Sequence, residues 1–334
     1  MTFPLPLPLA DPELAAALSA RLDLVEERLR GAVTHADLLA DSASRHLVNA
    51  GGKRLRSLLT LLTAQLGEGQ RPEVIDAAVV VELTHLATLY HDDVMDSAPM
   101  RRGAPTAHEV WGNSVAILIG DLLFARASRV VSGLGPEAVR IQAETFERLC
   151  LGQLHETVGP GAGDNAIEHY LQVLADKTGS LIATAARFGA MFAGCEPPVV
   201  AQVTSYGELA GVAFQLADDV IDVRSAAEVT GKTPGTDLRE RVATMPVLLL
   251  RERVAAGAGA EDRALLAAID GDLTSDARLA EVVAALGRHS VVDETSEKAR
   301  SWGDQAIAAI ADLPAGEVKD ALVAFADALV SRAG

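Results

Sequence analysis

Residues 77–96 read AAVVVELTHLATLYHDDVMD, and residues 209–222 read LAGVAFQLADDVID. Each stretch is apolar around almost the whole circumference of a helix and then ends in three aspartates spaced DDxxD. A helix that is apolar on every side needs neighbours on every side, so both stretches predict central helices of a large helical bundle. The fold class that follows is all-α.

The rest of the chain supports a single large bundle. Apolar residues recur at three- and four-residue spacing, whereas convincing alternation is absent and aromatic residues make up only 4% of the sequence. Gly and Pro clusters predict helices of roughly 15 to 25 residues. The predicted breaks lie at residues 67–72, 97–105, 159–165, 194–198, 230–236 and 255–259. We expect one domain over residues 1–334, with a motif-bearing core at about 40–260 and C-terminal helices at 261–334.

Composition excludes several classes of protein. The net charge of −17 argues against a nucleic-acid partner, because no stripe of Lys and Arg could neutralise a phosphate backbone. No uninterrupted apolar run reaches the ~18 residues of a membrane span, and the N-terminus lacks the features of a signal peptide. Cys150 and Cys195 are the only cysteines and belong to no metal-binding pattern, so we expect two buried thiols and a cytoplasmic protein.

The two aspartate clusters predict metal binding. In each, the first and last carboxylates are four residues apart and therefore share one face of the helix. Like charges at that spacing repel, so two such clusters beside apolar residues imply a cation between them. Oxygen ligands of this kind suit Mg²⁺, which commonly shares its coordination shell with substrate phosphates.

Basic residues stand beside glycine turns, where they could bind the same anion. They are Lys53, Arg54 and Arg56 after a Gly-Gly pair, Arg101 and Arg102 before Gly103, Lys177, and Lys232 within residues 231–235. Such cations bind diphosphates through charge-assisted hydrogen bonds. The sequence contains no nucleophile motif of the GxSxG or Walker type, and metal-assisted departure of a diphosphate needs none.

These motifs together resemble those of trans-type isoprenyl diphosphate synthases of medium or long product chain length. The resemblance covers roughly residues 40–260. The matching motifs, in family order, are residues 51–56 (GGKRLR), 91–96 with 101–103 (HDDVMD and RRG), 120–121 (GD), 152–153 (GQ), 176–179 (DKTG), 214–222 (FQLADDVID) and 231–237 (GKTPGTD). A single DDxxD would be weak in an acidic protein, whereas two within this ordered set are specific.

The resemblance implies a bundle around a deep central cavity, a homodimer, and a role for each site residue. The implied Mg²⁺ ligands, for about three ions per active site, are Asp92, Asp93, Asp96, Asp218, Asp219 and Asp222. The implied allylic diphosphate site is Arg101, Lys177, Thr178, Gln215 and Lys232. The implied isopentenyl diphosphate site is Lys53, Arg56, His85 and Arg102. Of these residues, Asp92, Asp96, Asp218, Arg101, Lys177 and Lys232 are expected to carry catalysis.

The implied reaction begins when the allylic diphosphate ionises, with Mg²⁺ and the cations stabilising the leaving group. The double bond of isopentenyl diphosphate then attacks the allylic cation, and loss of a proton gives a chain one isoprene unit longer. The released diphosphate is the expected proton acceptor. His91, beside the first cluster, is expected to be a hydrogen-bond partner rather than a metal ligand.

Two positions depart from the family pattern. Ser57 stands where the family usually has proline, which should change loop rigidity more than charge. Val242 stands where short-chain members carry a further diphosphate-binding lysine, and the neighbouring Arg241 is a candidate substitute.

The residues below the first cluster bear on product length. Thr88, Ala87 and Thr84 lie four, five and eight positions before Asp92 and are all small. One helical turn advances about 5.4 Å, comparable to one isoprene unit, so small residues leave the first turns open. Short-chain relatives place an aromatic residue at the fourth or fifth position. We therefore expect a product longer than C15, and a medium or long polyprenyl diphosphate rather than geranylgeranyl diphosphate.

Three alternatives remain open. The first is a geranylgeranyl diphosphate synthase, the shortest product compatible with the open turns. The second is an all-α terpene cyclase, although such enzymes rarely keep a second DDxxD and their cavities are rich in aromatic residues. The third is a non-catalytic subunit of a heteromeric synthase, although those typically lose one aspartate motif.

Overall fold

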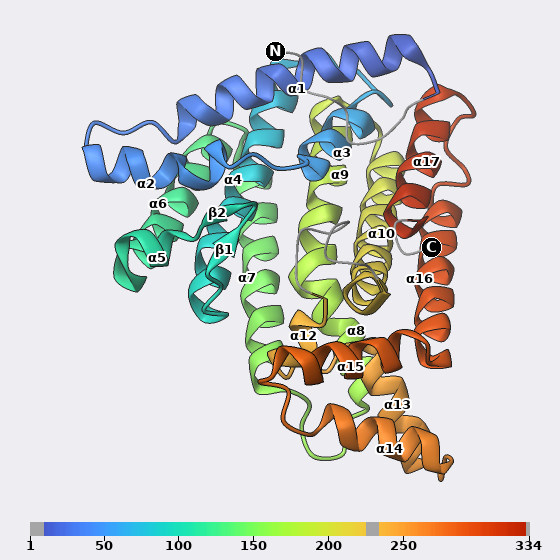
Figure 1. The fold of residues 1–334 in the computed structure, drawn as a ribbon. Coiled ribbons are helices and arrows are strands. Elements are labelled where there is room, and N and C mark those ends of the chain that lie inside the picture. The colour runs from blue at the N-terminus through green and yellow to red at the C-terminus, as the bar shows by residue number, and fades with distance from the viewer. Residues whose placement is uncertain (1–9, 225–233, 332–334) are drawn as a thin grey trace. The chain divides into compact units, whose positions relative to one another are not determined.

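The computed structural model of the chain describes residues 10–224 and 234–331, which are helical apart from loops and one short hairpin (Figure 1). In chain order the elements are α1 (Pro12–Ala32), α2 (Leu38–Asn49), α3 (Leu55–Ala64), α4 (Pro72–Met95), β1 (Met100–Arg101), β2 (Ala104–Pro105), α5 (Ala107–Trp111), α6 (Asn113–Ser132), α7 (Pro136–Val158), α8 (Ala166–Leu174), the π-helix η1 (Ala175–Gly179), α9 (Ser180–Phe192), α10 (Pro197–Arg224), α12 (Thr236–Arg239), α13 (Met245–Ala255), α14 (Ala260–Ile269), α15 (Asp276–Gly287), α16 (Ser290–Ala309) and α17 (Glu317–Ser331). The all-α prediction is confirmed.

Local sequence explains where helices begin. The Asp37 carboxylate accepts a hydrogen bond of 2.9 Å from the Ala40 amide at the start of α2. The Asn165 side chain likewise accepts from two amides in the first turn of α8. Such side chains satisfy amides that have no partner inside the helix. Pro72 opens α4, at a position where its missing amide hydrogen costs nothing.

The described helices form two compact units. The first comprises Met1–Leu149, Ser180–Glu208 and Ala309–Phe325, and the second comprises Cys150–Gly179, Leu209–Ala308 and Ala326–Gly334. The boundaries fall within long helices, because α7 and α10 each contribute residues to both units. The expectation of one domain over residues 1–334 stays a prediction.

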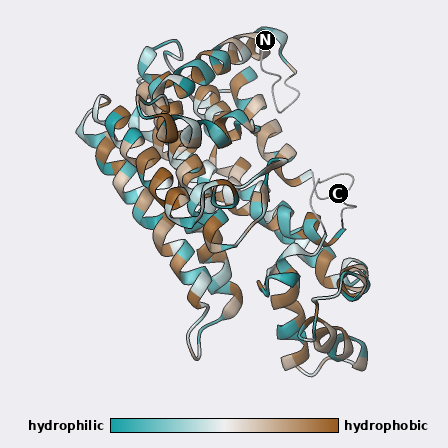
Figure 2. Cartoon of the chain, turned by 60° about the vertical axis from the view of Figure 1, so that its left-hand side comes forward, coloured by the Kyte–Doolittle hydropathy of each residue, from teal (hydrophilic) through white to brown (hydrophobic). Residues whose placement is uncertain are grey.

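The first unit is built around α4. This helix packs against α3, α6 and α9, and α1 lies across it as well (Figure 1). Residues 77–84 of α4 are buried without exception, as its apolar circumference predicts. Close packing explains one glycine: a Cβ at Gly189 of α9 would lie 2.1 Å from the Thr60 carbonyl oxygen of α3. Figure 2 shows polar and apolar residues on separate faces of many helices.

A two-residue hairpin follows α4. Met100 pairs with Pro105 and Arg101 with Ala104 in an antiparallel register. Arg102 and Gly103 form the turn with φ angles of 54° and 78°. Positive φ at both central residues is the geometry that joins short antiparallel strands most tightly. These strands are too short to produce an alternating pattern, which is why the sequence did not predict them.

The second unit encloses its own apolar core. Buried residues of α10, α13, α15 and α16 meet there, among them Leu216, Leu250, Leu286 and Val291. Gly235, just before α12, has a φ of 77°, and a Cβ there would lie 2.2 Å from a methyl group of Val283. This glycine therefore allows the end of the 231–237 motif to approach α15 closely.

The predicted helix breaks are largely confirmed. The breaks at 67–72, 97–105, 159–165, 194–198 and 255–259 each separate consecutive helices, while 230–236 falls partly outside the described residues. Of the described helices, α4 alone is long and apolar enough to cross a membrane, and 67% of its most apolar window is buried within the protein. Packing in the core accounts for that composition.

The prediction of two buried thiols is wrong. Both cysteines are free, but Cys150 is exposed and Cys195 is only partly buried. Helix α7 buries a narrow face that includes Leu149 and Gly152, and Cys150 lies between them on the outward side. A cysteine inside an amphipathic helix takes the exposure of its helical position, which residue type alone does not determine.

Candidate active site

The first aspartate cluster forms the last turn of α4. Asp93 is 1% exposed, and its Oδ1 accepts hydrogen bonds of 2.7 Å from Nε and from a terminal nitrogen of Arg101. Burial raises the pKa of Asp93, and the Arg101 guanidinium opposes that shift. Asp92 is partly buried and Asp96 is exposed. The middle carboxylate therefore faces inward and holds the hairpin, whereas the outer two share the more accessible face.

The second cluster on α10 repeats this arrangement in the other unit. Asp219 is 5% exposed, and its carboxylate accepts hydrogen bonds from the Tyr170 hydroxyl, at 3.0 and 2.9 Å, and from the Met245 amide at 3.1 Å. Burial holds the pKa of Asp219 well above its usual range, although both hydrogen bonds lower it. Asp218 and Asp222 are more accessible. Again the outer pair is the more accessible one.

Each outer pair, taken by itself, offers oxygen ligands of the kind that suit a magnesium ion. Among the described residues, no three or more Asp, Glu, His or Cys side chains converge as a complete metal-binding group. A pair of carboxylates supplies two ligands, so the remaining positions would have to come from water or substrate oxygens. Mg²⁺ is commonly bound in this way, through one or two carboxylates plus phosphates.

The three basic residues of the GGKRLR motif lie in different environments. Lys53 is exposed and Arg56 is partly buried. The Arg54 side chain is fully buried, where it pairs with Glu26 of α1 and, at 2.7 Å, with Glu82 of α4. Arg54 is therefore a structural residue that anchors the start of α3, and it is not available to a substrate.

A cluster of positive charge surrounds His85. Arg102 donates to the Leu47 carbonyl at 3.2 Å and to that of Gly51, and a Cβ at Gly52 would lie 2.9 Å from its Cζ. Burial lowers the pKa of Arg56, with Arg102 adding to that shift and Glu82 opposing it. Burial and the neighbouring arginines also hold the pKa of His85 well below its usual range, so this imidazole is neutral at pH 7.

The structure therefore brings together three of the four predicted isopentenyl diphosphate residues, Arg56, His85 and Arg102. Burial is the main cause of their lowered pKa values, and the charges of Arg56 and Arg102 add to the shift of His85. The Arg56 Nε is buried without a hydrogen-bond partner among the described residues. A buried donor without a partner is costly, so an anionic ligand at this position would satisfy it.

Glu82 is a residue of this cluster that sequence reasoning did not place in the site. It is 2% exposed, pairs with Arg54, and accepts a hydrogen bond of 3.3 Å from the Ser57 hydroxyl. A lone carboxylate inside an apolar helix was a signal that a buried cation lay nearby. Ser57 thus makes a bond that the usual proline of the family could not make.

Lys177 and Thr178 lie on the π-helix η1 in the second unit. A Cβ at Gly152 would lie 2.7 Å from the Lys177 amide nitrogen, so the glycine allows α7 to approach η1 closely. The Lys177 ammonium pairs with Glu156 of α7. Single π-helical turns inside α-helices often occur at functional sites. The spacing of residues 176–179 did not predict this turn.

Other expected site residues have mixed outcomes. Gln215 is partly buried on α10, three residues before Asp218. Lys232 lies outside the described residues. Arg241 donates to the carbonyls of Ile269, Asp270 and Gly271, at 3.4, 3.2 and 2.7 Å, at the end of α14. Its guanidinium therefore satisfies a helix terminus, which is a structural role.

His91 contacts a neighbouring helix. Its Nε2 lies 3.1 Å from the Ile117 carbonyl oxygen and 3.4 Å from a carboxylate oxygen of Asp121 on α6. A Cβ at Gly120 would lie 2.3 Å from that nitrogen. The GD pair at 120–121 thus receives the imidazole, which explains both the glycine and the expected hydrogen-bonding role of His91.

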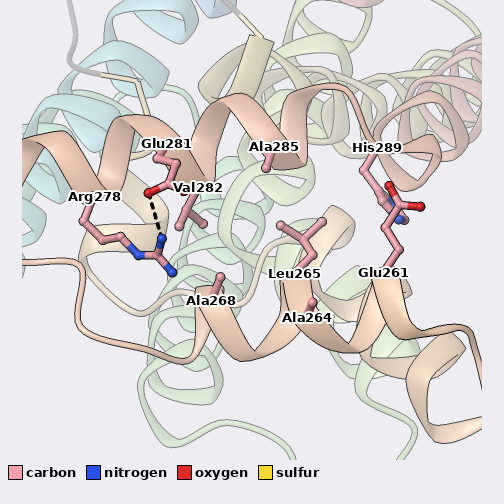
Figure 3. Close-up of a pocket in the computed structure, with 9 residues that line it drawn as sticks. All are labelled: Glu261, Ala264, Leu265, Ala268, Arg278, Glu281, Val282, Ala285 and His289. Carbon is pink, nitrogen blue, oxygen red and sulfur yellow. Dashed lines mark hydrogen bonds and ion pairs between the residues drawn. The ribbon is translucent and has the colours of Figure 1, made fainter.

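A groove between α14 and α15 contains none of the predicted site residues. Its volume is about 260 Å³, and its sides include Ala264, Leu265, Val282 and Ala285 (Figure 3). An ion pair of 2.7 Å between Arg278 and Glu281 lies at one end. The groove offers no convergent set of cations for a diphosphate, so it is not the candidate active site.

Comparison with known proteins agrees with these motifs. The profile of the polyprenyl synthetase family matches residues 38–286. A nonaprenyl diphosphate synthase from Mycobacterium tuberculosis (strain ATCC 25618 / H37Rv) is 44% identical over 98% of this chain and 96% of its own.

Solved structures agree as well. A polyprenyl synthase from Caulobacter crescentus CB15, complexed with calcium and isoprenyl diphosphate, is 33% identical with a TM-score of 0.87, over 96% of this chain and 97% of its own. A geranylgeranyl pyrophosphate synthase from Corynebacterium glutamicum, also complexed with calcium and isoprenyl diphosphate, is 41% identical with a TM-score of 0.85, over 98% of this chain and 99% of its own. The chain therefore belongs to the polyprenyl synthetase family of prenyltransferases.

Proposed function

We propose that this protein condenses an allylic diphosphate with isopentenyl diphosphate and releases a trans-polyprenyl diphosphate longer than C15. The observation that carries the proposal is the shared design of the two aspartate clusters. In each, the middle carboxylate is buried and anchored, which leaves the outer pair, Asp92 with Asp96 and Asp218 with Asp222, on the accessible face. Two such pairs suit Mg²⁺ bound together with a diphosphate.

The arginine cluster of the first unit is the proposed isopentenyl diphosphate site. Arg56 and Arg102 supply fixed positive charge, and the exposed Lys53 supplies a third cation. His85, held neutral by burial and by its cationic neighbours, can donate one hydrogen bond to a phosphate oxygen without adding charge. These residues bind the diphosphate group of isopentenyl diphosphate and orient the molecule, so that its double bond faces the allylic substrate.

The allylic diphosphate is proposed to bind through Lys177, Thr178, Gln215 and Lys232, together with Arg101. Mg²⁺, when bound by the outer aspartates, supplies the positive charge that stabilises the departing diphosphate. Lys177 adds charge at the same leaving group, and Glu156 holds its ammonium in place until substrate binds. The released diphosphate accepts the proton that is lost after the new bond forms.

Product length is proposed to depend on the face of α4 below Asp92. Ala87 and Thr84 are fully buried, and Thr88 is partly buried. The Gln142 amide of α7 donates a hydrogen bond of 2.7 Å to the Thr84 hydroxyl. Thr84 lies eight residues before Asp92, or about 12 Å along the helix axis. A polar contact between α7 and α4 therefore lies at Thr84, the position farthest from Asp92 among the three proposed to limit product length.

Substitution at Thr88 tests whether this face of α4 limits product length. Phe at this position should shorten the product, because the larger ring blocks the first helical turn below the aspartates. Val is the matched control, since it keeps the volume of Thr and should leave the product distribution unchanged. Products are compared by chromatographic chain-length analysis. If Thr88→Phe and Thr88→Val give products of the same chain length, this face of α4 does not determine product length.

One assay separates the proposed synthase from its alternatives. The purified protein is incubated with Mg²⁺, labelled isopentenyl diphosphate and an allylic primer. Diphosphates longer than C15 support the proposed synthase; chains beyond C20 identify a medium- or long-chain enzyme, and a single C20 product identifies a geranylgeranyl diphosphate synthase. A hydrocarbon supports a terpene cyclase, and inactivity supports a non-catalytic subunit. Asp92→Asn and Asp218→Asn should each abolish elongation.

We also propose that the enzyme acts in the cytoplasm as a homodimer. On α5 and α6, Val110, Ile117 and Leu118 are 49%, 43% and 65% exposed. Exposed large apolar side chains on helices that pack together, as α5 and α6 do, favour association. Leu118→Glu should convert the dimer into a monomer in light scattering, and an unchanged mass would place the interface elsewhere.

A further inference from the structure

Tyr170 joins three elements of the second unit through one carboxylate. Its hydroxyl lies 3.0 and 2.9 Å from the two oxygens of Asp219, and the Met245 amide lies 3.1 Å from Oδ2. Tyr170 belongs to α8, Asp219 to α10, and Met245 is the first residue of α13. The amide at the start of a helix has no partner within that helix, so Asp219 satisfies a donor that would otherwise be lost.

These contacts leave Asp219 little freedom to bind a metal. The carboxylate is 5% exposed and receives two donors from the protein. Asp218 and Asp222, one residue before and three residues after it, are more accessible. The direction in which Asp219 is held therefore sets the rotation of α10 about its own axis, and with it the direction of the outer pair.

Tyr170 also lies close in sequence to two residues of the proposed allylic site. Helix α8 continues directly into η1, and Lys177 and Thr178 follow Tyr170 by seven and eight residues. The hydrogen bond to Asp219 thus connects the helix that carries Lys177 with the helix that carries Asp218.

We infer that Tyr170 is a positioning residue, which acts through Asp219 to orient Asp218 and Asp222 for the metal ions of the reaction. This inference rests on the proposed function. It assigns Asp219 to the support of the metal site, in contrast to the expectation that all three aspartates of the cluster are ligands. Hydrogen-bond partners of this kind typically influence metal affinity or activity by about 10- to 100-fold.

The test compares two tyrosines. Tyr170→Phe removes the hydroxyl from Asp219, and Tyr206→Phe removes a hydroxyl that donates at 2.7 Å to the Leu322 carbonyl in the first unit. Tyr170→Phe loses a partly buried hydrogen bond and Tyr206→Phe a buried one, so Tyr206→Phe should lose at least as much stability. Mn²⁺ binding is measured by electron paramagnetic resonance in the presence of inorganic diphosphate, and kcat and KM are measured for elongation.

Tyr170→Phe should weaken Mn²⁺ binding by about tenfold or more. It should lower kcat while leaving the KM for isopentenyl diphosphate unchanged, because Arg56 and Arg102 are untouched. Tyr206→Phe should match the wild type in both measurements. Equal Mn²⁺ affinity in the two variants would overturn the inference. If Tyr170→Phe does not fold, Asp219→Asn keeps the side-chain volume and should show the same Mn²⁺ deficit, and its absence would count equally against the inference.

The two proposals fail in different ways. A wild-type protein that binds Mn²⁺ with diphosphate but transfers no prenyl group contradicts the proposed function. An active wild type whose Mn²⁺ affinity is insensitive to Tyr170→Phe contradicts the positioning role alone.

Discussion

Gly152→Ala should separate catalysis from stability. The added Cβ would lie 2.7 Å from the Lys177 amide nitrogen and 3.1 Å from the Asp176 carbonyl carbon. Favourable contacts of this kind need about 3.5 Å, so α7 and η1 must move apart by roughly 0.8 Å. Both groups nearest the new methyl are backbone atoms, so no side chain can rotate to relieve the clash.

The expected effect on stability is small. Overpacking of this kind lowers the free energy of unfolding by about 1–3 kcal/mol, whereas replacing glycine by alanine within a helix raises it by about 1 kcal/mol. The effect on rate should be larger, because a displacement near 1 Å of a catalytic group can cost about 100-fold. We expect kcat for elongation to fall by about 10- to 100-fold, with Lys177 displaced from the leaving diphosphate.

The assay is steady-state elongation with labelled isopentenyl diphosphate, alongside thermal unfolding. Gly31→Ala is the matched control: Gly31 lies within α1, and a Cβ there would have nothing within 4 Å. It should be neutral or stabilising by up to about 1 kcal/mol, with unchanged activity. Activity of Gly152→Ala within twofold of the wild type would refute the argument that this close approach positions Lys177.

Three further predictions concern the first unit. Glu82→Gln should lower the free energy of unfolding by about 3–5 kcal/mol in urea denaturation, because it removes a buried partner of Arg54. The pKa of His85 is depressed in the folded state, so below pH 6.5 the unfolded chain binds the extra proton. Stability should therefore fall as pH drops from 6.5, by at most about 1.4 kcal/mol per pH unit for this group, and His85→Gln should flatten the dependence of the melting temperature on pH. Gly120→Ala should cost about 1–3 kcal/mol by thermal unfolding, and His91→Ala in the same chain should recover most of that loss; simple additivity of the two substitutions would contradict the proposed contact.

Several features of the fold were predictable because their causes are local. Clusters of Gly and Pro commonly end helices, so five of the described breaks could be located from composition, whereas single glycines such as Gly120 and Gly189 lie inside helices. The all-round apolar character of residues 77–90 identified a central helix, because a helix without a polar face cannot meet water. The exposure of Cys150 was not predictable in the same way, since it depends on which face α7 turns outward.

The candidate active site likewise has features that local sequence predicted and features that it could not predict. Spacing alone placed the outer aspartates of each cluster on one face, and residue type identified the cations beside glycine turns. Spacing could not show that Asp93 turns inward to Arg101, or that Asp219 turns inward to Tyr170. It also could not separate Arg54, which is buried against Glu26 and Glu82, from its neighbours in the same motif.

The sequence by itself determined the helical class, the chemistry of the ligands and their order along the chain, because periodicity and residue type are properties of short segments. Only the tertiary structure decided which charged residues are buried against a partner within the protein and which stay accessible. The physical reason is that a buried charge must find a partner, and that partner usually lies far away in sequence. Tyr170 and Asp219, which are 49 residues apart, are one such pair.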